Sequence, residues 1–248
     1  MSKQVDYEIP AIERAAKRFE HHLRTFGFRE STIIDYTNRA RRYLTFCDTD
    51  RPTQEDAERF RDHLINRRLS RSSINNYSFV VQSFHKMIGD AVILPHLKIN
   101  EKLPYFFDER DIKQIFDSIT NIKHLCILQI GFYTSLRASE VANLDDSDID
   151  LINKTIRIRG GKGDRDALLY LNDICIDTII KYLKKRPKRL IDGRQPLFYS
   201  TKNKRYDRKG IYNIFRRCKT NAGITKPGGS HVFFRHSSAT LLLNRGCD

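Results

Sequence analysis

The sequence has few residues arranged to hold a metal or to build a disulfide framework. Its five cysteines are dispersed, odd in number and never spaced as CxxC, which argues against a zinc knuckle and against paired disulfides. The eight histidines show no HxxxH spacing. Cys126 and Cys175 fall within apolar periodicity, and we expect them to be small core residues. The sequence therefore predicts no metal site and no cofactor.

Long apolar runs are also missing. The best one, from Leu125 to Tyr133, is far shorter than the ~20 residues that cross a bilayer. The first ten residues, MSKQVDYEIP, contain no apolar signal core. We therefore expect an intracellular protein without a membrane partner.

Positive charge is what the chain has in excess. The formal net charge is +15 and the isoelectric point is about 9.7. Such an excess produces self-repulsion unless a polyanion neutralises it, so nucleic acid is the favoured partner, ahead of a membrane surface. Residues 181–219 are the most basic stretch, with Asp192 and Asp207 as its only acids. We expect a cytoplasmic protein associated with the DNA of the nucleoid.

The spacing of apolar residues predicts four helices in the first hundred residues. The first begins after Pro10, which suits a helix start, and the second follows a short break. A capping-box pattern, Thr53 with Asp56, opens the third. The fourth begins at about Ser70. We expect residues 1–95 to form a helical bundle with basic outer faces.

Residues 96–104 are polar and lie between two prolines, which is typical of an extended linker. In residues 105–248, the segments TIRIRG and DALLYL flank a glycine-containing turn and predict a strand–turn–strand unit. The predicted fold is mainly α, with two domains and a small antiparallel sheet in the second. Further helical patterns lie at 108–119, 122–133, 173–186, 208–221 and 231–244.

Three basic motifs begin or end predicted elements: Arg137 in SLRASEV, Lys162 in GGKGD and Arg235 in HVFFRHSSAT. Each one alone is also compatible with a solvated surface residue, most of all the lysine of GGKGD. Cations that converge from distant segments, however, are suited to hold and neutralise a phosphodiester while it is cleaved. GGKGD lacks the GxxxxGK[ST] spacing of a Walker loop. Its lysine is predicted at a hairpin tip, from which it can donate a proton.

Arg137 is predicted at a helix start, where the helix dipole disfavours a cation. A phosphate bound by the guanidinium and by free backbone N–H groups would reverse that effect, with Glu140 orienting the guanidinium. His231 and Arg235 are four positions apart and would share one face of an α-helix. We expect these residues of the same segment to face the core: Phe233, Phe234, Ala239, Leu242 and Leu243.

Together, the three motifs resemble the catalytic signature of the tyrosine recombinases, also called phage-type integrases, including the Xer-like branch. The order matches: an arginine in an (L)RxSE(L/V) helix, a lysine in a GKG hairpin, and a histidine–arginine box that ends RHS-x-AT. The two-domain layout matches as well. The resemblance implies a SAM-like core-binding domain in residues 1–95, joined by residues 96–104 to a catalytic domain in residues 105–248.

The resemblance also implies roles for single residues. Arg137 and Arg235 correspond to the arginines that clamp the scissile phosphate, and Lys162 to the hairpin lysine that protonates the 5′ hydroxyl leaving group. His231 corresponds to the histidine that assists proton transfer, while His236 has a supporting role. In this family a tyrosine attacks the phosphate and forms a 3′-phosphotyrosyl bond without a metal or nucleotide.

The chain departs from the family pattern at two points. The family box reads HxxR, whereas His231 stands four residues before Arg235. No tyrosine follows Tyr212, although the family places its nucleophile after the box. We therefore expect an incomplete catalytic domain, ending at Asp248, that binds DNA and does not cleave it. The alternatives are a recombinase-derived DNA-binding regulator or competitor without catalytic activity, and a basic RNA-binding protein.

The expected partner is double-stranded DNA at a specific recombination site, bound mainly through its phosphates. The start of the fourth predicted helix offers a surface for reading bases. We expect this chain to be a monomer in solution and the complete enzyme to form a tetramer on DNA. The candidate DNA-binding residues are Arg67, Arg68, Arg71, Asn75 and Asn76.

Overall fold

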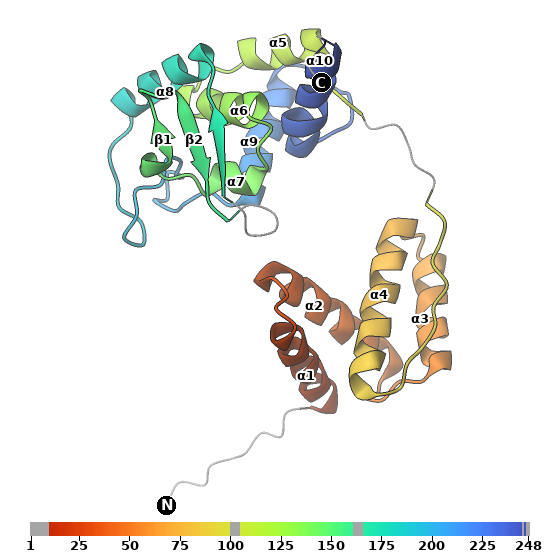
Figure 1. Cartoon of the computed structure of the whole chain (residues 1–248). Helices are drawn as coiled ribbons and strands as arrows, with labels where there is room; N and C mark the ends of the chain where they lie inside the picture. Colours follow the sequence, from red (N-terminus) through yellow and green to blue (C-terminus); the bar gives the residue numbers. More distant parts are fainter. Residues whose placement is uncertain (1–9, 100–104, 161–165, 245, 247–248) are drawn as a thin grey trace, which may run out of the picture. The chain divides into compact units, whose positions relative to one another are not determined.

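The computed structural model describes residues 10–99, 105–160, 166–244 and 246. The chain forms two compact units, residues 1–102 and residues 103–248 (Figure 1). Each unit has its own hydrophobic core. The described part of the first unit is helical, and the second unit combines helices with a three-stranded sheet. The predicted fold class, mainly α with a small antiparallel sheet, is confirmed.

Four helices make up the described part of the first unit, at the predicted places. They are α1 (Ala11–Thr25), α2 (Glu30–Cys47), α3 (Gln54–Asn66) and α4 (Arg71–Ile88). Thr53 and Asp56 form the predicted capping box of α3. Gly89 ends α4 with φ 83°, a left-handed conformation in which glycine meets no steric penalty. The fully buried aromatic side chains of this bundle include Phe19, Tyr43 and Phe84.

Residues 90–99 have neither helix nor strand, but they are bound to the bundle. The side-chain amide of Gln54 pairs with the backbone N–H and C=O of Ile93, each at 3.0 Å. Asn75 pairs with the backbone of Leu97 in the same way, at 2.8 and 2.9 Å. The predicted linker therefore begins in a segment that side chains of α3 and α4 hold in place, which we call the anchored segment.

Tyr43 and His85 form a hydrogen-bonded pair inside the first unit, where both are fully buried. The Tyr43 hydroxyl lies 2.8 Å from His85 Nε2, and His85 Nδ1 lies 3.0 Å from the carbonyl oxygen of Asp90. Because a carbonyl only accepts, Nδ1 carries the proton and Nε2 accepts from the hydroxyl. Burial lowers the pKa of His85 below its ordinary value of 6.5, since the imidazolium ion would lose its hydration.

The lowered pKa of His85 predicts that the first unit loses stability in acid. Well above pH 6.5, His85 is neutral in both the folded and the unfolded state. As the pH falls through 6.5, the unfolded chain binds a proton that the folded unit does not, so the free energy of unfolding decreases until the folded pKa is reached. Hydrogen exchange of α2 and α4 amides between about pH 7.5 and about pH 5.5 measures this decrease. In His85→Gln the free energy of unfolding should depend less steeply on pH. An equally steep decrease in that variant would show that His85 is not its cause.

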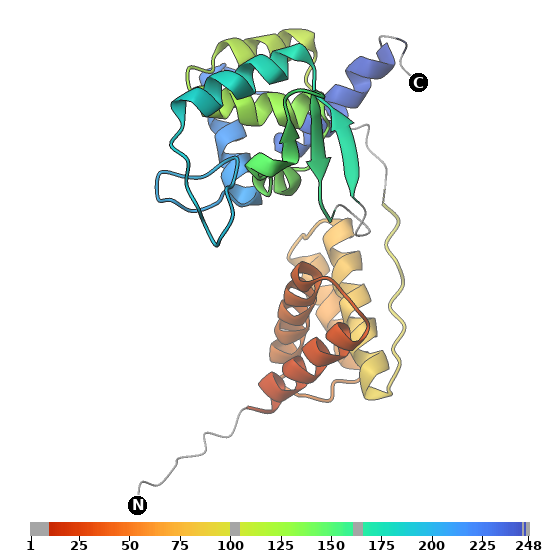
Figure 2. The same ribbon diagram turned by 60° about the vertical axis from the view of Figure 1, so that its left-hand side comes forward.

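The second unit combines six α-helices in its described part with a small sheet (Figure 2). Strands β1 (Ile149–Asp150), β2 (Thr155–Ile158) and β3 (Ala167–Tyr170) pair antiparallel in the order β1-β2-β3. The two longer strands are those predicted, while β1 is too short to show an alternating pattern. The helices are α5 (Glu109–Asp117), α6 (Ile122–Tyr133), α7 (Ala138–Ala142), α8 (Asp173–Lys185), α9 (Arg208–Asn221) and α10 (Ser238–Asn244). Residues 232–237 form a π-helix directly before α10.

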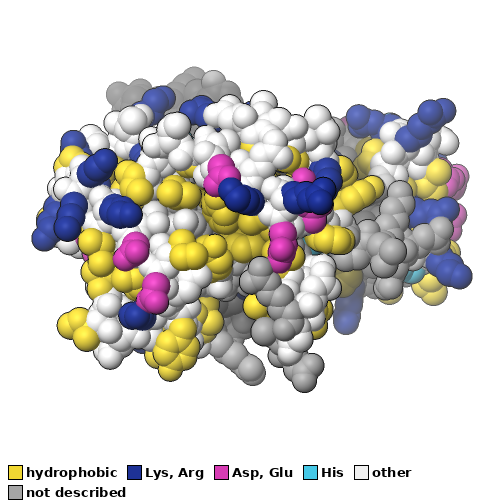
Figure 3. Space-filling view, turned by 90° about the horizontal axis from the view of Figure 1, so that it is seen from above, with side chains coloured by type: hydrophobic (Ala, Val, Ile, Leu, Met, Phe, Trp, Pro, Cys, Tyr) yellow, Lys and Arg dark blue, Asp and Glu magenta, His cyan; other side chains and the backbone are white. Residues whose placement is uncertain are grey.

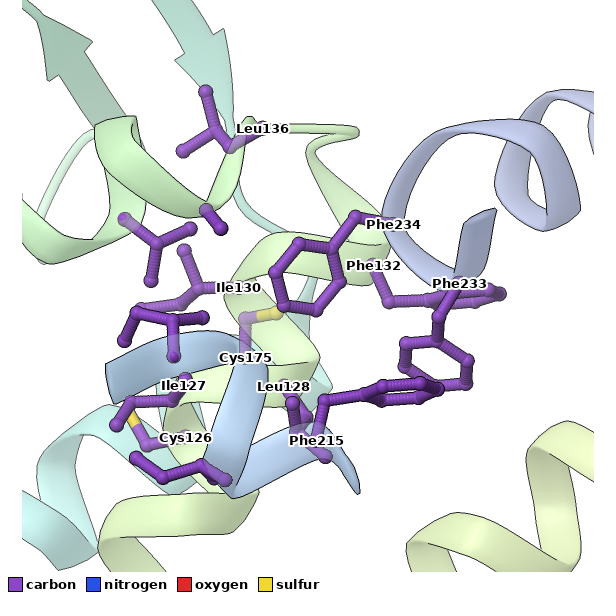
Figure 4. Packing of buried hydrophobic residues seen from close by; sticks show 14 of the residues in the cluster. Cys126, Ile127, Leu128, Ile130, Phe132, Leu136, Cys175, Phe215, Phe233 and Phe234 are labelled. Atoms are coloured by element: carbon purple, nitrogen blue, oxygen red, sulfur yellow. The ribbon is translucent and has the colours of Figure 1, made fainter. Parts of the chain in front are cut away.

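Helix α6 lies in the core of the second unit (Figure 4). Its residues Cys126, Ile127, Leu128 and Ile130 are all fully buried, so the middle of the helix is buried on every side. Cys175 of α8 is also fully buried, and burial raises the pKa of its thiol to about 12. Both cysteines are packing residues, as predicted.

The last segment of the chain differs partly from its prediction. Phe233 and Phe234 are fully buried, as expected. Ala239 is exposed, and Leu242 and Leu243 are 49% and 66% exposed, so the expectation that these three face the core is wrong. The reason is that α10 leaves the body of the unit after Ser238, as Figure 2 shows.

The surface of the second unit is mixed on the side that carries α5, α8 and α10. Figure 3 shows Lys and Arg side chains there, interspersed with acidic and apolar ones rather than joined into one basic surface. Within the described ranges, no group of three His, Cys, Asp or Glu side chains is placed to hold a metal ion. No helix in those ranges is long and apolar enough to span a membrane.

Candidate phosphate-binding site

Arg137 is the N-cap residue of α7, as the sequence predicts. The Glu140 carboxylate accepts hydrogen bonds from the backbone N–H of Arg137 and from its Nη1, both at 2.7 Å. The Glu140 side chain is 14% exposed and that of Arg137 is 41% exposed. The Glu140 carboxylate therefore accepts the free backbone N–H at the start of α7 and orients the Arg137 guanidinium, which still faces solvent.

Arg235 reaches the same part of the unit from the π-helix. Its Nη1 donates to the carbonyl oxygen of Ser135 at 3.3 Å, and Ser135 lies two residues before Arg137. The hydroxyls of Ser135 and Ser238 also lie 3.0 Å apart. Ser135 has φ 54°, a left-handed conformation that turns the chain sharply between α6 and α7. The two arginines that the sequence predicts at one phosphate therefore stand on segments that touch.

His231 and His236 contact each other near Arg235. Their ring centroids lie 4.5 Å apart and their planes are inclined by 75°. The expected α-helix at this place is a π-helix, whose hydrogen bonds join residues five apart instead of four. Burial lowers the pKa of His231, and the positive charges of His236, Arg235 and Arg208 lower it further.

Arg208 is a residue near this site that the sequence analysis did not single out. It is the first residue of α9, it is exposed, and its charge acts on His231. It belongs to the basic stretch 181–219, where nothing in the local pattern distinguishes it from its neighbours. Only the packing of α9 within the unit brings it near the histidine.

Lys162 lies outside the described residues, although both sides of its hairpin are described. At the end of β2, Arg159 donates to Asp145 at 2.9 Å and to Asp148 at 2.7 Å. On the other side, Asp166 accepts a hydrogen bond at 3.1 Å from the backbone N–H of the glycine after Arg159. Carboxylates therefore hold the base of the hairpin that carries the predicted lysine.

The acidic segment before β1 is a second feature that the sequence analysis missed. The side chains of Asp145 and Asp148 are each only 5% exposed. Asp145 also pairs with Arg205, and the adjacent Asp146 pairs with Arg186, both from the basic connection between α8 and α9. Buried charges persist when they are paired. The run LDDSD in a strongly basic chain was the signal that could have revealed this role.

The sequence profile of the phage integrase family matches residues 105–248 of this chain. The chain belongs to the phage integrase family. It is 28% identical over 241 residues to the tyrosine recombinase XerA of Pyrococcus horikoshii, a match that covers 94% of this chain and 80% of the relative. This similarity agrees with the resemblance that the three motifs carry.

Solved structures agree with this membership. A crystal structure of XerA recombinase, 27% identical, covers 96% of this chain and 86% of its own, with a TM-score of 0.55. The Tn1549 transposon integrase, solved in complex with transposon right end DNA, has a TM-score of 0.73 at 18% identity and covers 94% and 88%. The second likeness concerns the fold alone.

The first unit of this integrase-family chain carries the candidate DNA-binding residues. Arg67, Arg68 and Asn76 are exposed. Arg71 is also exposed, but its Nη1 donates at 2.9 Å to a backbone carbonyl of the anchored segment. Asn75 is only 6% exposed, and both ends of its amide bind that segment. The structure thus gives Asn75 a packing role in place of the expected contact with bases.

A basic groove that the sequence did not reveal borders Arg67 in the same unit. Its volume is about 690 Å³. Arg42, which lines the groove, donates to the Tyr77 hydroxyl at 3.0 Å. The groove therefore combines cations with aromatic surface. Its lining includes Arg41, Arg42, Phe46, His63, Arg67 and Tyr77.

Proposed function

We propose that this chain binds duplex DNA at a recombination site and holds one phosphodiester there for site-specific recombination. The observation that carries the proposal is the hydrogen bond from Arg235 to the Ser135 carbonyl, because it joins the segments of two arginines. Guanidinium groups that lie close together repel each other, and Glu140 compensates the charge of Arg137. A phosphate is the anion that suits such a pair, since guanidinium binds it through two parallel hydrogen bonds.

The proposed roles of the site residues are those that the family resemblance implies, and the chemistry of each side chain suits its role. Arg137 and Arg235 neutralise charge that develops on the phosphate. The lowered pKa of His231 favours its neutral form, which is suited to accept a proton. Lys162 protonates the 5′ oxygen as its bond to phosphorus breaks, which yields the free 5′ hydroxyl. In the complete enzyme a tyrosine attacks the phosphate and forms the 3′-phosphotyrosyl bond, which retains the bond energy that rejoining needs.

Both units take part in DNA binding in this proposal. Residues 1–95 act as the core-binding domain, residues 96–104 as the linker and residues 105–248 as the catalytic domain. Arg67, Arg68 and Asn76, with the neighbouring basic groove, offer contacts to phosphates and base edges. We propose a monomer in solution and a tetramer on DNA for the complete enzyme, which acts on the DNA of the nucleoid.

The 248-residue chain is expected to bind a labelled duplex without forming a covalent adduct, because no tyrosine follows Tyr212. Arg137→Ala and Arg235→Ala should each weaken binding about tenfold, since each removes a charge-assisted contact worth about 1.5 kcal/mol. Gel-shift titration measures the affinity, and a denaturing gel detects an adduct. Lys113→Ala is the control, because Lys113 is already paired with Asp117. A covalent adduct formed by this chain would contradict the expected lack of cleavage, and unchanged affinity in both arginine variants would contradict the phosphate site.

The same basic residues also suit a second candidate function, a DNA-binding regulator or competitor derived from a recombinase. Appending a tyrosine-bearing segment separates the two. A recombinase should then capture a nicked recombination site covalently, and Arg137→Ala should abolish the capture. If the extended chain binds the nicked site and never captures it, the regulator is supported and the catalytic proposal is wrong.

A further inference from the structure

The π-helix at residues 232–237 explains how two histidines of one segment meet. In an α-helix, a residue five positions onward points about 140° away from the first, so His231 and His236 would lie on different sides. The i→i+5 hydrogen bonding of a π-helix brings that residue back above the first. The rings of His231 and His236 accordingly lie 4.5 Å apart, and Arg235 stands beside the second histidine in the chain. This wide turn is therefore what makes the two rings neighbours.

Two phenylalanine side chains that pack into the core hold the π-helix in place. The ring of Phe233 enters an aromatic cluster, 5.0 Å from Phe215 and 5.1 Å from Phe132 between ring centroids. The ring of Phe234 lies against Gly131 of α6, where an added Cβ would be only 2.5 Å from a ring atom. Consecutive residues of an α-helix point about 100° apart, so two neighbouring phenylalanines that are both fully buried constrain the turn strongly. Gly131 thus provides the space that Phe234 needs.

A buried hydroxyl closes the same turn. Ser237 Oγ donates to the carbonyl oxygen of Val232, five residues earlier, at 3.1 Å. Ser237 Oγ also accepts a hydrogen bond at 2.8 Å from the backbone N–H of Phe107. Ser237 is fully buried, so no water replaces either contact if the hydroxyl is removed. Ser237 therefore ties the start of the π turn to the segment that precedes α5.

We propose that Ser237 and Gly131 are positioning residues which hold the π turn, and that this turn makes His231 and His236 a coupled pair beside Arg235. This inference rests on the proposed phosphate site, whose chemistry it specifies: a proton on either ring opposes a proton on the other, so one imidazole of the pair remains able to accept a proton. Nδ1 of His236 is buried and has no hydrogen-bond partner among the described residues.

The charges that act on His231 agree with such a pair. They are His236 and Arg235 on its own segment and Arg208 at the start of α9, and all three are cationic or can become so. Each disfavours the protonated form of His231. Protonation of one histidine therefore opposes protonation of the other, which is the condition for a coupled titration.

The test is an NMR titration of the histidine rings in the whole 248-residue chain. The native chain should show a ring-to-ring cross-peak between His231 and His236. His236→Asn should raise the pKa of His231, because it removes a positive neighbour. Ser237→Ala should abolish the cross-peak and raise the pKa of His231 as well, since the rings separate. In the Ser237→Ala/His236→Asn double variant the pKa of His231 should rise no further than in His236→Asn alone.

Matched variants separate positioning from general loss of stability. Ser118→Ala removes a comparable hydroxyl, which donates to the Ile115 carbonyl at 2.8 Å, and should leave both rings unchanged. Gly131→Ala should displace Phe234 and disrupt the pair, and Gly131→Ala/Phe234→Leu should restore the cross-peak by making room for the new methyl group. This second series tests the proposal even if Ser237→Ala does not fold.

The proposal is overturned if Ser237→Ala and Gly131→Ala both fold and keep the native cross-peak and the native titration of His231. It is also overturned if the two rings titrate independently in the native chain. Failure of the proposed function looks different, because a native chain with the coupled pair but without affinity for duplex DNA would contradict only the DNA-binding role.

Discussion

Replacing Phe233 with alanine is expected to lower the free energy of unfolding of the second unit by about 3–5 kcal/mol. The side chain is fully buried, and Figure 4 shows it beside Phe132 of α6 and Phe215 of α9. The lost ring leaves a cavity that these neighbours fill only in part, because each is held by its own helix. A domain of this size is stabilised by about 5–15 kcal/mol, so the variant should be partly unfolded under mild conditions. Urea denaturation, followed through hydrogen exchange of α6 amides, measures the loss.

Phe106→Ala is the matched control in the same unit. Phe106 is 45% exposed, so its truncation should change the free energy of unfolding by about 1 kcal/mol or less. If Phe233→Ala destabilised the unit no more than Phe106→Ala, the aromatic cluster would not be what holds the histidine–arginine segment in place.

Raising the salt concentration from about 50 to about 200 mM is expected to weaken duplex DNA binding about 10³-fold, if about six phosphates are contacted. The net charge of +15 supplies more than enough cations for that number. Each neutralised phosphate releases condensed counterions, and the entropy of that release shrinks as the bulk salt rises. The slope of log affinity against log salt concentration, from fluorescence anisotropy, gives the number of contacts.

Single arginines should contribute unequally to this slope. Arg67 is exposed beside the basic groove, so Arg67→Ala should make the slope shallower by about one unit. Arg24 already binds Glu20 at 3.0 Å and Glu30 at 2.8 Å, so Arg24→Ala should leave the slope nearly unchanged. Equal slopes for the two variants would show that Arg67 does not contact the DNA backbone.

The helices of the first unit could be predicted because their ends depend on neighbouring residues. The Thr53–Asp56 capping box and Gly89 act within one helical turn, so the sequence pattern contains the whole interaction. The role of Asn75 could not be predicted in this way. Its amide binds the backbone of Leu97, 22 positions away, and only the folded bundle brings that segment to α4.

The π turn shows the same limit inside the candidate site. The segment HVFFRHSSAT has the composition of an ordinary amphipathic helix, and an α-helix was the natural prediction. The π-helix depends on the space that Gly131 leaves for the Phe234 ring and on the hydrogen bond from the Phe107 N–H to Ser237. Both partners belong to distant segments. A difference of one residue per turn then decided which side chains stand next to His231.

By itself, the sequence determined the two-part helical fold, most of the element boundaries and membership of the phage integrase family, because these follow from local periodicity and from the order of three short motifs. Only the tertiary structure decided which side chains meet. The contact of Arg235 with Ser135 spans 100 positions, and the pairing of Asp145 with Arg205 spans 60. Such contacts depend on how whole helices pack against one another, and no pattern within a single segment records that geometry.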